Sequence, residues 1–491
     1  MADESPLERE RRQKVERIRS EGREPFPWSF VGRVTSDRVR DAAARLPPGE
    51  ENREHLFRVA GRLRATRVHG KTAFADLEDR AGSLQLLFRA ETMGEPEFRA
   101  RLDELDPGDI VGAEGYAATS KRGEPSLVVG SIALLAKAIA PPPEKFHGLT
   151  DVEERLRRRY LDLLSSEESR SLFRARTMLI REIRRYLDTA EFLEVETPIL
   201  LPVASGAAAV PFVTHSRYLD ADLQLRIAQE LPLKRLLVGG MERVYELGRT
   251  FRNEDMDTTH SPEFTELELY WAYADYHDMR RLIEGLFGHL AQSVRTLLPS
   301  VPAVQQAAND FTPPFASVDF VEELERRSGI HDVLSKSSDE LRELARAAGS
   351  TVPDRSTAGT FLDKLFEHYV EPHLKGLTFV LDHPAATTPL AKRHRSRPGR
   401  VERFEMFYGG YELGNAYTEL NDPDEQERRF QEQLGTRGED AYAYDADFVR
   451  ALRHGMPPAT GIGIGVDRLI MGLTGSTSIK DVLLFPLTRP R

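Results

Sequence analysis

Apolar and polar positions alternate in short segments between residues 57 and 135, and glycines separate these segments. Five of the segments have the length of β-strands: FRVAGRLRA, TAFADLED, SLQLLF, DIVGAEGYA and SLVVGSIALL. The separating glycines are Gly70, Gly82, Gly108 and Gly123. Five short strands of this kind predict a small closed barrel, such as an OB-fold, which we place at residues 55–140.

The segments on either side of this region differ in character. Between Leu7 and Glu21, arginine and glutamate recur at helix-like spacing with few apolar positions. This pattern predicts a solvated charged helix, with contact to an RNA backbone as the alternative. We assign residues 1–54 to this helix and an extension. Three consecutive prolines, Pro141 to Pro143, stiffen the chain, so residues 141–160 are expected to form a linker.

Residues 161–491 predict a larger α+β unit. Helical periodicity covers residues 170–189 and most of the stretch from about 275 to 375. Apolar segments of strand length lie at 243–253, 263–271, 402–420 and 459–466. Within the second of these, alternation gathers four side chains on one face: Phe264, Glu266, Glu268 and Tyr270.

The face with two carboxylates and a phenol is costly to bury without a ligand or partners. On the incoming strand, Arg252 and Glu254 share a face, and arginine binds phosphate well because its planar, charged group can bond through two nitrogens. A hairpin held by salt bridges is the simpler explanation of this polar face alone.

Two further segments carry candidate chemistry. In GIGIGVDRLIMGL, three glycines share one strand face, which lets a flat ligand lie against the backbone, and Arg468 follows in the first turn of a helix, where an anion binds well. A glycine-weakened core strand before a capped helix is the alternative.

In RFEMFYGGYELG, a tight turn at the two glycines makes Glu405 and Glu412 diagonal neighbours, and Mg²⁺ with phosphate oxygens suits such a pair.

These segments lie in the order and spacing of one enzyme class. FRNE with HSPEFTELELY resembles motif 2 of the class II aminoacyl-tRNA synthetases, GIGIGVDR resembles motif 3, and FLEVETP, ending at Pro198, resembles motif 1. Together with RYLDLL and LLFPLTRP, they make the chain similar to the bacterial-type lysine-specific members of subclass IIb, from about Glu24 to its end. The resemblance implies an anticodon-binding OB-fold and a catalytic domain built on an antiparallel β-sheet flanked by helices, with a helical insertion at about 275–375.

The implied activity is that of a lysine–tRNA ligase. ATP activates L-lysine to lysyl-adenylate with release of pyrophosphate, and lysine then passes to the 3′ end of tRNA(Lys). Mg²⁺ is the implied cofactor, and motif 1 implies a homodimer. Arg252 would hold the α-phosphate and the lysine carboxylate, and Arg468 the γ-phosphate, which makes these two arginines the catalytic residues.

By the same resemblance, adenine stacks on Phe264 with Glu254 and His260 nearby, and the magnesium ligands are Glu405 and Glu412. The implied lysine-binding residues are Gly206, Glu230, Glu268, Tyr270, Asn415, Tyr417 and Glu419. The implied anticodon-binding residues are Arg67, Phe74, Gln85 and Glu124. Strict alternation puts Asn415 and Glu412 on opposite faces, so a bulge or kink near Gly414 is expected if both serve one site.

The chain departs from the family pattern around the lysine pocket. Valine at 210 stands where arginine is usual, and Arg217-Tyr218 replaces Asn-Ala. QLRIAQELP replaces YLRIAPELY, which changes Gln224, Gln229 and Pro232, and Tyr417 replaces phenylalanine. These changes affect the expected lysine affinity and leave the proposed ATP and magnesium positions intact.

The amino-acid composition limits the cellular compartment and the kinds of partner that we expect. The absence of cysteine excludes disulfides, thiolate metal sites and a cysteine nucleophile, and the net charge of -11 argues against a general nucleic-acid coat. Because no apolar run is long enough for a bilayer and the first residues do not resemble a signal peptide, we expect a cytoplasmic protein without a membrane partner.

Four other functions remain as alternatives. A class IIb synthetase for another amino acid, such as aspartate, is disfavoured because Glu230 and Glu419 would repel an acidic side chain. A non-catalytic tRNA-binding or regulatory relative would not need the phosphate and metal residues, and a ligase that attaches lysine to protein would not need the barrel. A metal hydrolase built on His368 and His373 is disfavoured because that spacing misses one helix face.

Overall fold

The computed structural model describes residues 4–143, 151–299, 301–351, 356–434 and 444–489. The chain divides into two compact units, which are described separately. The first comprises Met1–Thr150 and Tyr160–Ser165, and the second comprises Asp151–Arg159 and Ser166–Arg491. None of the helices in the described ranges combines the length and apolar content that crossing a lipid bilayer requires.

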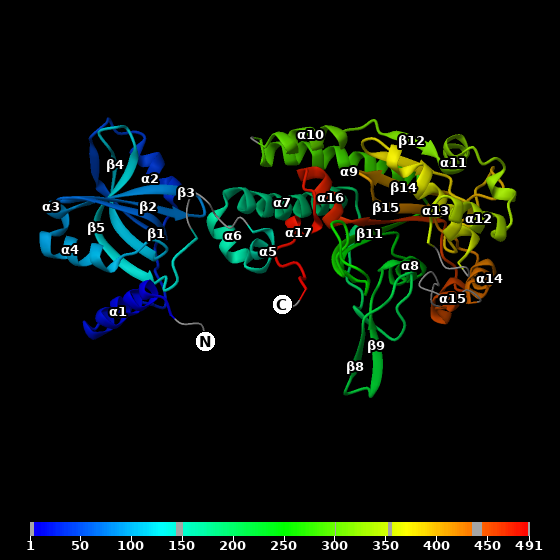
Figure 1. Cartoon of the computed structure of the whole chain (residues 1–491), viewed down its shortest axis with the longest axis horizontal. Helices are drawn as coiled ribbons and strands as arrows, with labels where there is room; N and C mark the ends of the chain where they lie inside the picture. The colour runs from blue at the N-terminus through cyan, green and yellow to red at the C-terminus, as the bar shows by residue number, and fades with distance from the viewer. Residues whose placement is uncertain (1–3, 144–150, 300, 352–355, 435–443, 490–491) are drawn as a thin grey trace. The chain divides into compact units, whose positions relative to one another are not determined.

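Five strands of the first unit close into a barrel in the order β1-β2-β3-β5-β4 (Figure 1), which confirms the predicted small closed barrel. The strands are β1 (Glu51–His69), β2 (Thr72–Asp79), β3 (Gly82–Arg89), β4 (Ile110–Thr119) and β5 (Pro125–Ala136). Inward-facing residues such as Leu77, Leu86 and Val129 are fully buried. The alternation of apolar and polar residues along each strand therefore corresponds to side chains that point into the barrel and out of it.

The charged N-terminal helix α1 (Pro6–Ser20) exposes most of its residues, as predicted for a solvated helix, while Arg11, Val15 and Ile18 are buried. Ile18 is buried in the same apolar cluster as the barrel interior. Lys14 Nζ lies 2.9 Å from Asp106 Oδ1, and Arg17 Nη2 donates to Asp103 Oδ2 at 2.7 Å. The basic residues therefore anchor α1 on its own unit. The other helices here are α2 (Ser36–Ala43), α3 (Ala90–Met93) and α4 (Glu95–Glu104).

The second unit is built on an eight-stranded sheet in the order β12-β13-β14-β15-β16-β11-β10-β6. Its strands are β6 (Leu193–Glu194), β10 (Arg243–Phe251), β11 (Glu263–Ala272), β12 (Ala316–Asp319), β13 (Thr378–Leu381), β14 (Arg403–Tyr408), β15 (Tyr411–Thr418) and β16 (Ala459–Gly465). Only the pairs β6–β10 and β12–β13 are parallel among these described strands. The predicted helical stretch at 275–375 thus also contributes one strand, β12, to the main sheet.

Three helices cover one face of the central strands of this sheet (Figure 1), and the opposite face carries polar residues beside a second apolar cluster that includes residues of helix α8 (Glu230–Val238). Leu267, Ile462 and Ile464 pack with buried residues of three helices in one apolar cluster. These helices are α7 (Glu167–Thr189), α9 (Tyr276–Leu297) and α16 (Val466–Thr474). On β11, Glu266, Glu268 and Tyr270 alternate with the apolar residues and point to the opposite face. These three side chains therefore lie on the face opposite the apolar cluster of Leu267, where they can contact a ligand.

The remaining elements of the described chain are short. A small sheet has the order β7-β9-β8, with β7 (Leu200–Leu201), β8 (Val213–Ser216) and β9 (Ala221–Leu225). The helices are α5 (Val152–Arg157), α6 (Arg159–Ser165), α8 (Glu230–Val238), α10 (Pro302–Asp310), α11 (Phe320–Ser328), α12 (Ser338–Ala347), α13 (Ala358–Tyr369), α14 (Pro423–Leu434), α15 (Ala446–Leu452) and α17 (Ile479–Val482). Helix α5 and the start of α6 fall within the expected linker at 141–160.

The hairpin of β14 and β15 carries the irregularity that the site requires. Gly409 and Gly410 have φ angles of 60° and 84° and form the two-residue turn. Phe407 pairs with Glu412, but Met406 pairs with Gly414, so Leu413 is an extra residue in β15. This β-bulge confirms the predicted irregularity near Gly414, and it brings Glu412 and Asn415 to the same face.

The bulge gives a test of the packing between β15 and β16. A Cβ at Gly414 would collide with the backbone carbonyl oxygen of Gly463, whereas a Cβ at Gly463 would have its nearest neighbour at 3.6 Å. We expect Gly414→Ala to lower the free energy of unfolding by about 1–3 kcal/mol because the backbone must move. Gly463→Ala is the matched control and should melt like the unmodified chain. Equal melting temperatures of both variants, measured by calorimetry, would contradict this packing.

Candidate active site

Two cavities adjoin on the polar face of the main sheet. Their empty volumes, which include space open to solvent, are about 740 and 810 Å³. Arg252, Glu266, Asn415 and Gly463 line both cavities, so the two form one continuous site. We call the first the arginine cavity, because Arg252 and Arg468 line it, and the second the carboxylate cavity, because Glu230, Glu266 and Glu268 line it.

Arg252 stands in the wall shared by the two cavities. Strand β10 ends at Phe251, so Arg252 and Glu254 lie in the following loop and not on the predicted strand, although both line the arginine cavity. The Arg252 guanidinium carbon lies 5.2 Å from the ring centroid of Phe264, and its Nη2 is 3.9 Å from Glu266 Oε1. Its Nε donates to the Ile227 carbonyl at 3.2 Å. The guanidinium is therefore oriented and only weakly paired.

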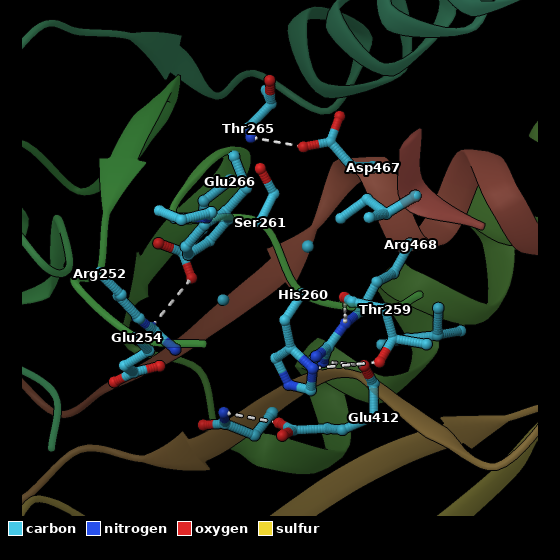
Figure 2. Close-up of a pocket in the computed structure, with 18 of the residues that line it drawn as sticks. Arg252, Glu254, Thr259, His260, Ser261, Thr265, Glu266, Glu412, Asp467 and Arg468 are labelled. Carbon is cyan, nitrogen blue, oxygen red and sulfur yellow. Dashed lines mark hydrogen bonds and ion pairs between the residues drawn. The ribbon is translucent and has the colours of Figure 1, made fainter. Parts of the chain in front are cut away.

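Arg468 provides a second cationic group, which reaches the arginine cavity from helix α16 (Figure 2). Its Nε donates to the Thr259 carbonyl at 3.0 Å and its Nη1 to the Glu412 carbonyl at 2.8 Å. Burial lowers the pKa of Arg468 from its ordinary value, and the positive charge of Arg252 lowers it further. His260 also lines the cavity and contacts Asp257 at 2.8 Å. Two guanidiniums without a full carboxylate partner favour a multiply charged anion.

A buried aspartate joins the elements that carry these groups. Asp467 is 1% exposed, and its Oδ1 lies 2.6 Å from Arg176 Nη1 on helix α7. Its Oδ2 accepts a hydrogen bond of 2.7 Å from the backbone N–H of Thr265 on β11 (Figure 2). Because Asp467 is the neighbour of Arg468 in α16, this bridge fixes the start of that helix against the sheet.

The carboxylate cavity contains most of the predicted lysine-binding residues. It is lined by Gly206, Glu230, Glu268, Tyr270, Asn415 and Tyr417 from that prediction. Glu268 accepts hydrogen bonds from the Tyr270 hydroxyl at 2.8 Å and from the Gln229 backbone N–H at 2.7 Å. Burial raises the pKa of Glu268 well above its ordinary value, and the charges of Glu266 and Glu230 raise it further. Such a cavity favours a cationic ligand.

Glu419 is the one predicted lysine-binding residue that does not line the cavity. Its side chain is fully buried behind Gly461, where a Cβ would collide with both Glu419 Oε1 and the Tyr270 ring. Glu419 forms an ion pair with Lys234, and Lys234 also pairs with Glu230. Burial raises the pKa of Glu419 to about 8, an effect that Lys234 opposes. Sequence reasoning missed Lys234, although its position four residues after Glu230 in α8 was a signal for the pair.

The two predicted magnesium ligands lie on one hairpin but have different surroundings. Glu412 lines the arginine cavity, and its Oε1 accepts a hydrogen bond from Asn415 Nδ2 at 3.0 Å. Glu405 lines neither cavity and is paired with Arg403, and burial raises the pKa of Glu405. No group of three or more acidic, histidine or cysteine residues in the described part of the chain could hold a metal. The two carboxylates are suitable Mg²⁺ ligands but would need phosphate oxygens to complete the site.

Three of the four predicted anticodon residues lie on neighbouring strands of the barrel, and the fourth, Glu124, lies in a loop. Arg67 on β1 lies opposite Phe74 on β2, and Phe74 packs partly against Leu87, Ala118 and Val128. Gln85 on β3 accepts a hydrogen bond from Ser126 at 2.9 Å, and Glu124 directly precedes β5. The inward side chains alternate with Arg67, Phe74 and Gln85, so these three share the outer face.

The departures from the family pattern have local structural roles. Gln224 Oε1 accepts the backbone N–H of Ala204 at 2.7 Å, and the Val210 carbonyl accepts that of Asn253 at 2.7 Å. Pro232 lies in the first turn of α8, where a missing N–H costs no helical hydrogen bond. Tyr218, next to Arg217 at the tip of the β8–β9 hairpin, is 95% exposed. The described contacts thus accommodate the changed residues.

Comparison with known proteins agrees with this geometry. The model of the class II tRNA synthetases (D, K and N) matches residues 151–489, and the model of the OB-fold nucleic acid binding domain matches residues 57–135. The predicted OB-fold and class II synthetase fold are thereby confirmed.

Full-length relatives narrow the family. The chain is 46% identical to a lysine–tRNA ligase of Moorella thermoacetica, with 98% of this chain and 97% of the relative aligned. It is 47% identical to a lysine–tRNA ligase of Roseiflexus castenholzii, with 99% of each chain aligned. A lysine–tRNA ligase of Shouchella clausii is 44% identical over 98% of this chain and 96% of its own length. The chain therefore belongs to the lysine–tRNA ligase family of the class II tRNA synthetases.

Proposed function

We propose that this chain activates L-lysine with ATP and transfers the lysine to tRNA(Lys). The observation that carries the proposal is Arg252, which stands between a cavity suited to polyphosphate and a cavity suited to an ammonium group. An enzyme that joins a lysine carboxylate to the α-phosphorus of ATP needs one cation at that junction.

The first step is an in-line attack of the lysine carboxylate on the α-phosphorus, which forms lysyl-adenylate and releases pyrophosphate. The nucleophile belongs to the substrate, so the protein supplies orientation and charge stabilisation. Arg252 holds the α-phosphate and the carboxylate, and Arg468 holds the γ-phosphate. Phe264 stacks on adenine beside Glu254 and His260.

The amino acid is selected in the carboxylate cavity. Glu268 and Gly206 bind the α-amino group, and Glu230, Glu419 and Tyr270 form the surroundings of the ε-ammonium, with Asn415 and Tyr417 lining the pocket. A rival side chain without an ammonium would leave buried carboxylates unpaired, which gives strong discrimination.

The second step transfers lysine to the terminal ribose hydroxyl of the tRNA, with release of AMP. We propose that the barrel, at about residues 55–140, binds the anticodon through Arg67, Phe74, Gln85 and Glu124, while residues 161–491 carry the chemistry. Outward aromatic and amide side chains suit unstacked bases, which are read by stacking and by hydrogen bonds to their edges.

Magnesium is the proposed cofactor, with Glu405 and Glu412 as its protein ligands. When bound with ATP, the ion would neutralise negative charge on the phosphates. Arg403 pairs with Glu405 in the structure, so this arginine would have to share the carboxylate.

We also propose a homodimer in the cytoplasm, where tRNA and ATP are available. Leu193, Ile199, Leu200 and Val213, in and near motif 1 and the small sheet, are each more than 40% exposed and offer an apolar surface to a second copy. A monomer in light scattering would contradict the dimer.

Pyrophosphate–ATP exchange with a panel of amino acids tests the substrate. We expect lysine to drive exchange and aspartate, asparagine and norleucine not to. Glu230→Gln should lower kcat/KM for lysine at least about 100-fold, because an ammonium loses its buried partner. Glu284→Gln on helix α9, whose carboxylate pairs with Arg280 away from both cavities, is the control. Exchange with an amino acid other than lysine would overturn the proposal.

The dependence of exchange on magnesium tests the metal ligands. Glu412→Gln removes a charged ligand, so half-maximal exchange should need roughly tenfold more Mg²⁺, while the KM for lysine stays the same. Identical magnesium titrations of this variant and the unmodified chain would remove Glu412 from the metal site.

Separate assays of the two steps test the barrel. Phe74→Ala should raise the KM for tRNA about tenfold in aminoacylation, because one stacked base loses its platform. Lysine-dependent exchange without tRNA should be unchanged. Leu56→Ala, an exposed residue elsewhere on β1, is the control. Loss of both activities together would point to misfolding and against a role in binding the anticodon.

A further inference from the structure

We propose that Lys234 and the hydroxyl of Tyr417 position Glu230 for substrate selection, by occupying one of its carboxylate oxygens and leaving the other for a single substrate ammonium. The inference rests on the proposed function and adds two groups to it: a lysine that the substrate does not need to touch, and a hydroxyl that distinguishes this chain from the usual phenylalanine.

Both donors bind the same atom. Lys234 Nζ donates to Glu230 Oε1 from one turn further along helix α8, and the Tyr417 hydroxyl on strand β15 donates to the same Oε1. Within the described residues, no hydrogen bond or ion pair involves Glu230 Oε2. Because Glu230 lines the carboxylate cavity, Oε2 is the oxygen that remains for a ligand.

Lys234 also sets the charge of the pocket. Its side chain has no exposed surface, and it lies between Glu230 and Glu419, with ion pairs to both. Its Nζ is 5.2 Å from the ring centroid of Tyr417 and 5.8 Å from that of Phe448, which favours the cation further. Because two carboxylates share this one ammonium, Lys234 cannot neutralise both of them fully.

Helix geometry explains why Lys234 is held so rigidly. Glu230 and Lys234 are four residues apart, with the carboxylate nearer the N-terminus, which is the favourable order for such a pair. Leu231, Leu233 and Leu237 bury the helix in an apolar cluster that also contains Tyr417. Neither donor can leave Glu230 without exposing a buried charge, so the carboxylate is fixed before substrate arrives.

The test uses Tyr417→Phe, Lys234→Met and the double variant in lysine-dependent pyrophosphate exchange. Tyr276→Phe is the matched control, because its hydroxyl donates to the Asp382 carboxylate at 2.8 Å in the same unit, outside both cavities. We expect the KM for lysine to rise about three- to tenfold in Tyr417→Phe and more than about tenfold in Lys234→Met. The KM for ATP should stay within about twofold, since a positioning role acts on one substrate.

The double variant should lose less than the product of the two single effects, because both groups act through one oxygen. Three results would overturn the inference. They are a loss in the double variant equal to the product of the single losses, equal changes in the KM for lysine and the KM for ATP, and an unchanged KM for lysine in Tyr417→Phe. If Lys234→Met does not fold, Tyr417→Phe decides alone, since it removes one buried oxygen and no charge. An unmodified chain that shows no exchange with lysine would instead refute the proposed function.

Discussion

Electrostatic repulsion among buried carboxylates is the constraint on which the site depends. Four of them gather at or behind one cavity: Glu230, Glu266, Glu268 and Glu419. Each needs a cation or a hydrogen-bond donor in the empty protein. Lys234 serves two of them, the Thr250 hydroxyl donates to Glu266 at 2.9 Å, and a backbone amide serves Glu268. An incoming diammonium substrate is attracted by the negative charge that remains. The excess of carboxylates over cations therefore both limits the stability of the pocket and favours binding of the substrate.

Positively charged side chains line the adjoining cavity, and Arg252 lines both cavities. Arg252 and Arg468 come from a loop and a helix that are distant in sequence, yet Asp467 ties the helix to β11 and to α7 through two short contacts. Gly463 contributes no side chain to the shared wall, so neighbouring ligands can meet there. The site thus places guanidinium groups beside buried carboxylates, with the nearest contact of Arg252 to Glu266 at 3.9 Å.

Alternation predicted most strands because one face of each is apolar, and it also predicted the face of β11 that carries Glu266 and Glu268. The bulge at Leu413 was foreseeable only from the requirement that Glu412 and Asn415 serve one site. Strand β12 was missed because four residues within a helical stretch carry too little periodicity. Lys234 was missed for a different reason: a lysine in LPLKRLL looks like a solvent-exposed helix position, and only the tertiary approach of Glu419 explains its burial.

The backbone amide of Gln229 is a donor that depends on the residue type at this position. It donates to Glu268, and a proline at this place, as the family pattern has, carries no hydrogen to donate. Gln229 therefore gives a buried carboxylate a hydrogen bond that a proline could not give, and the hydroxyl of Tyr417 gives another to the neighbouring Glu230. Such changes are epistatic: their value depends on how many other donors the pocket already has. Because the donors of this pocket come from several positions, a change at one of them alters which carboxylates must share the donors that remain.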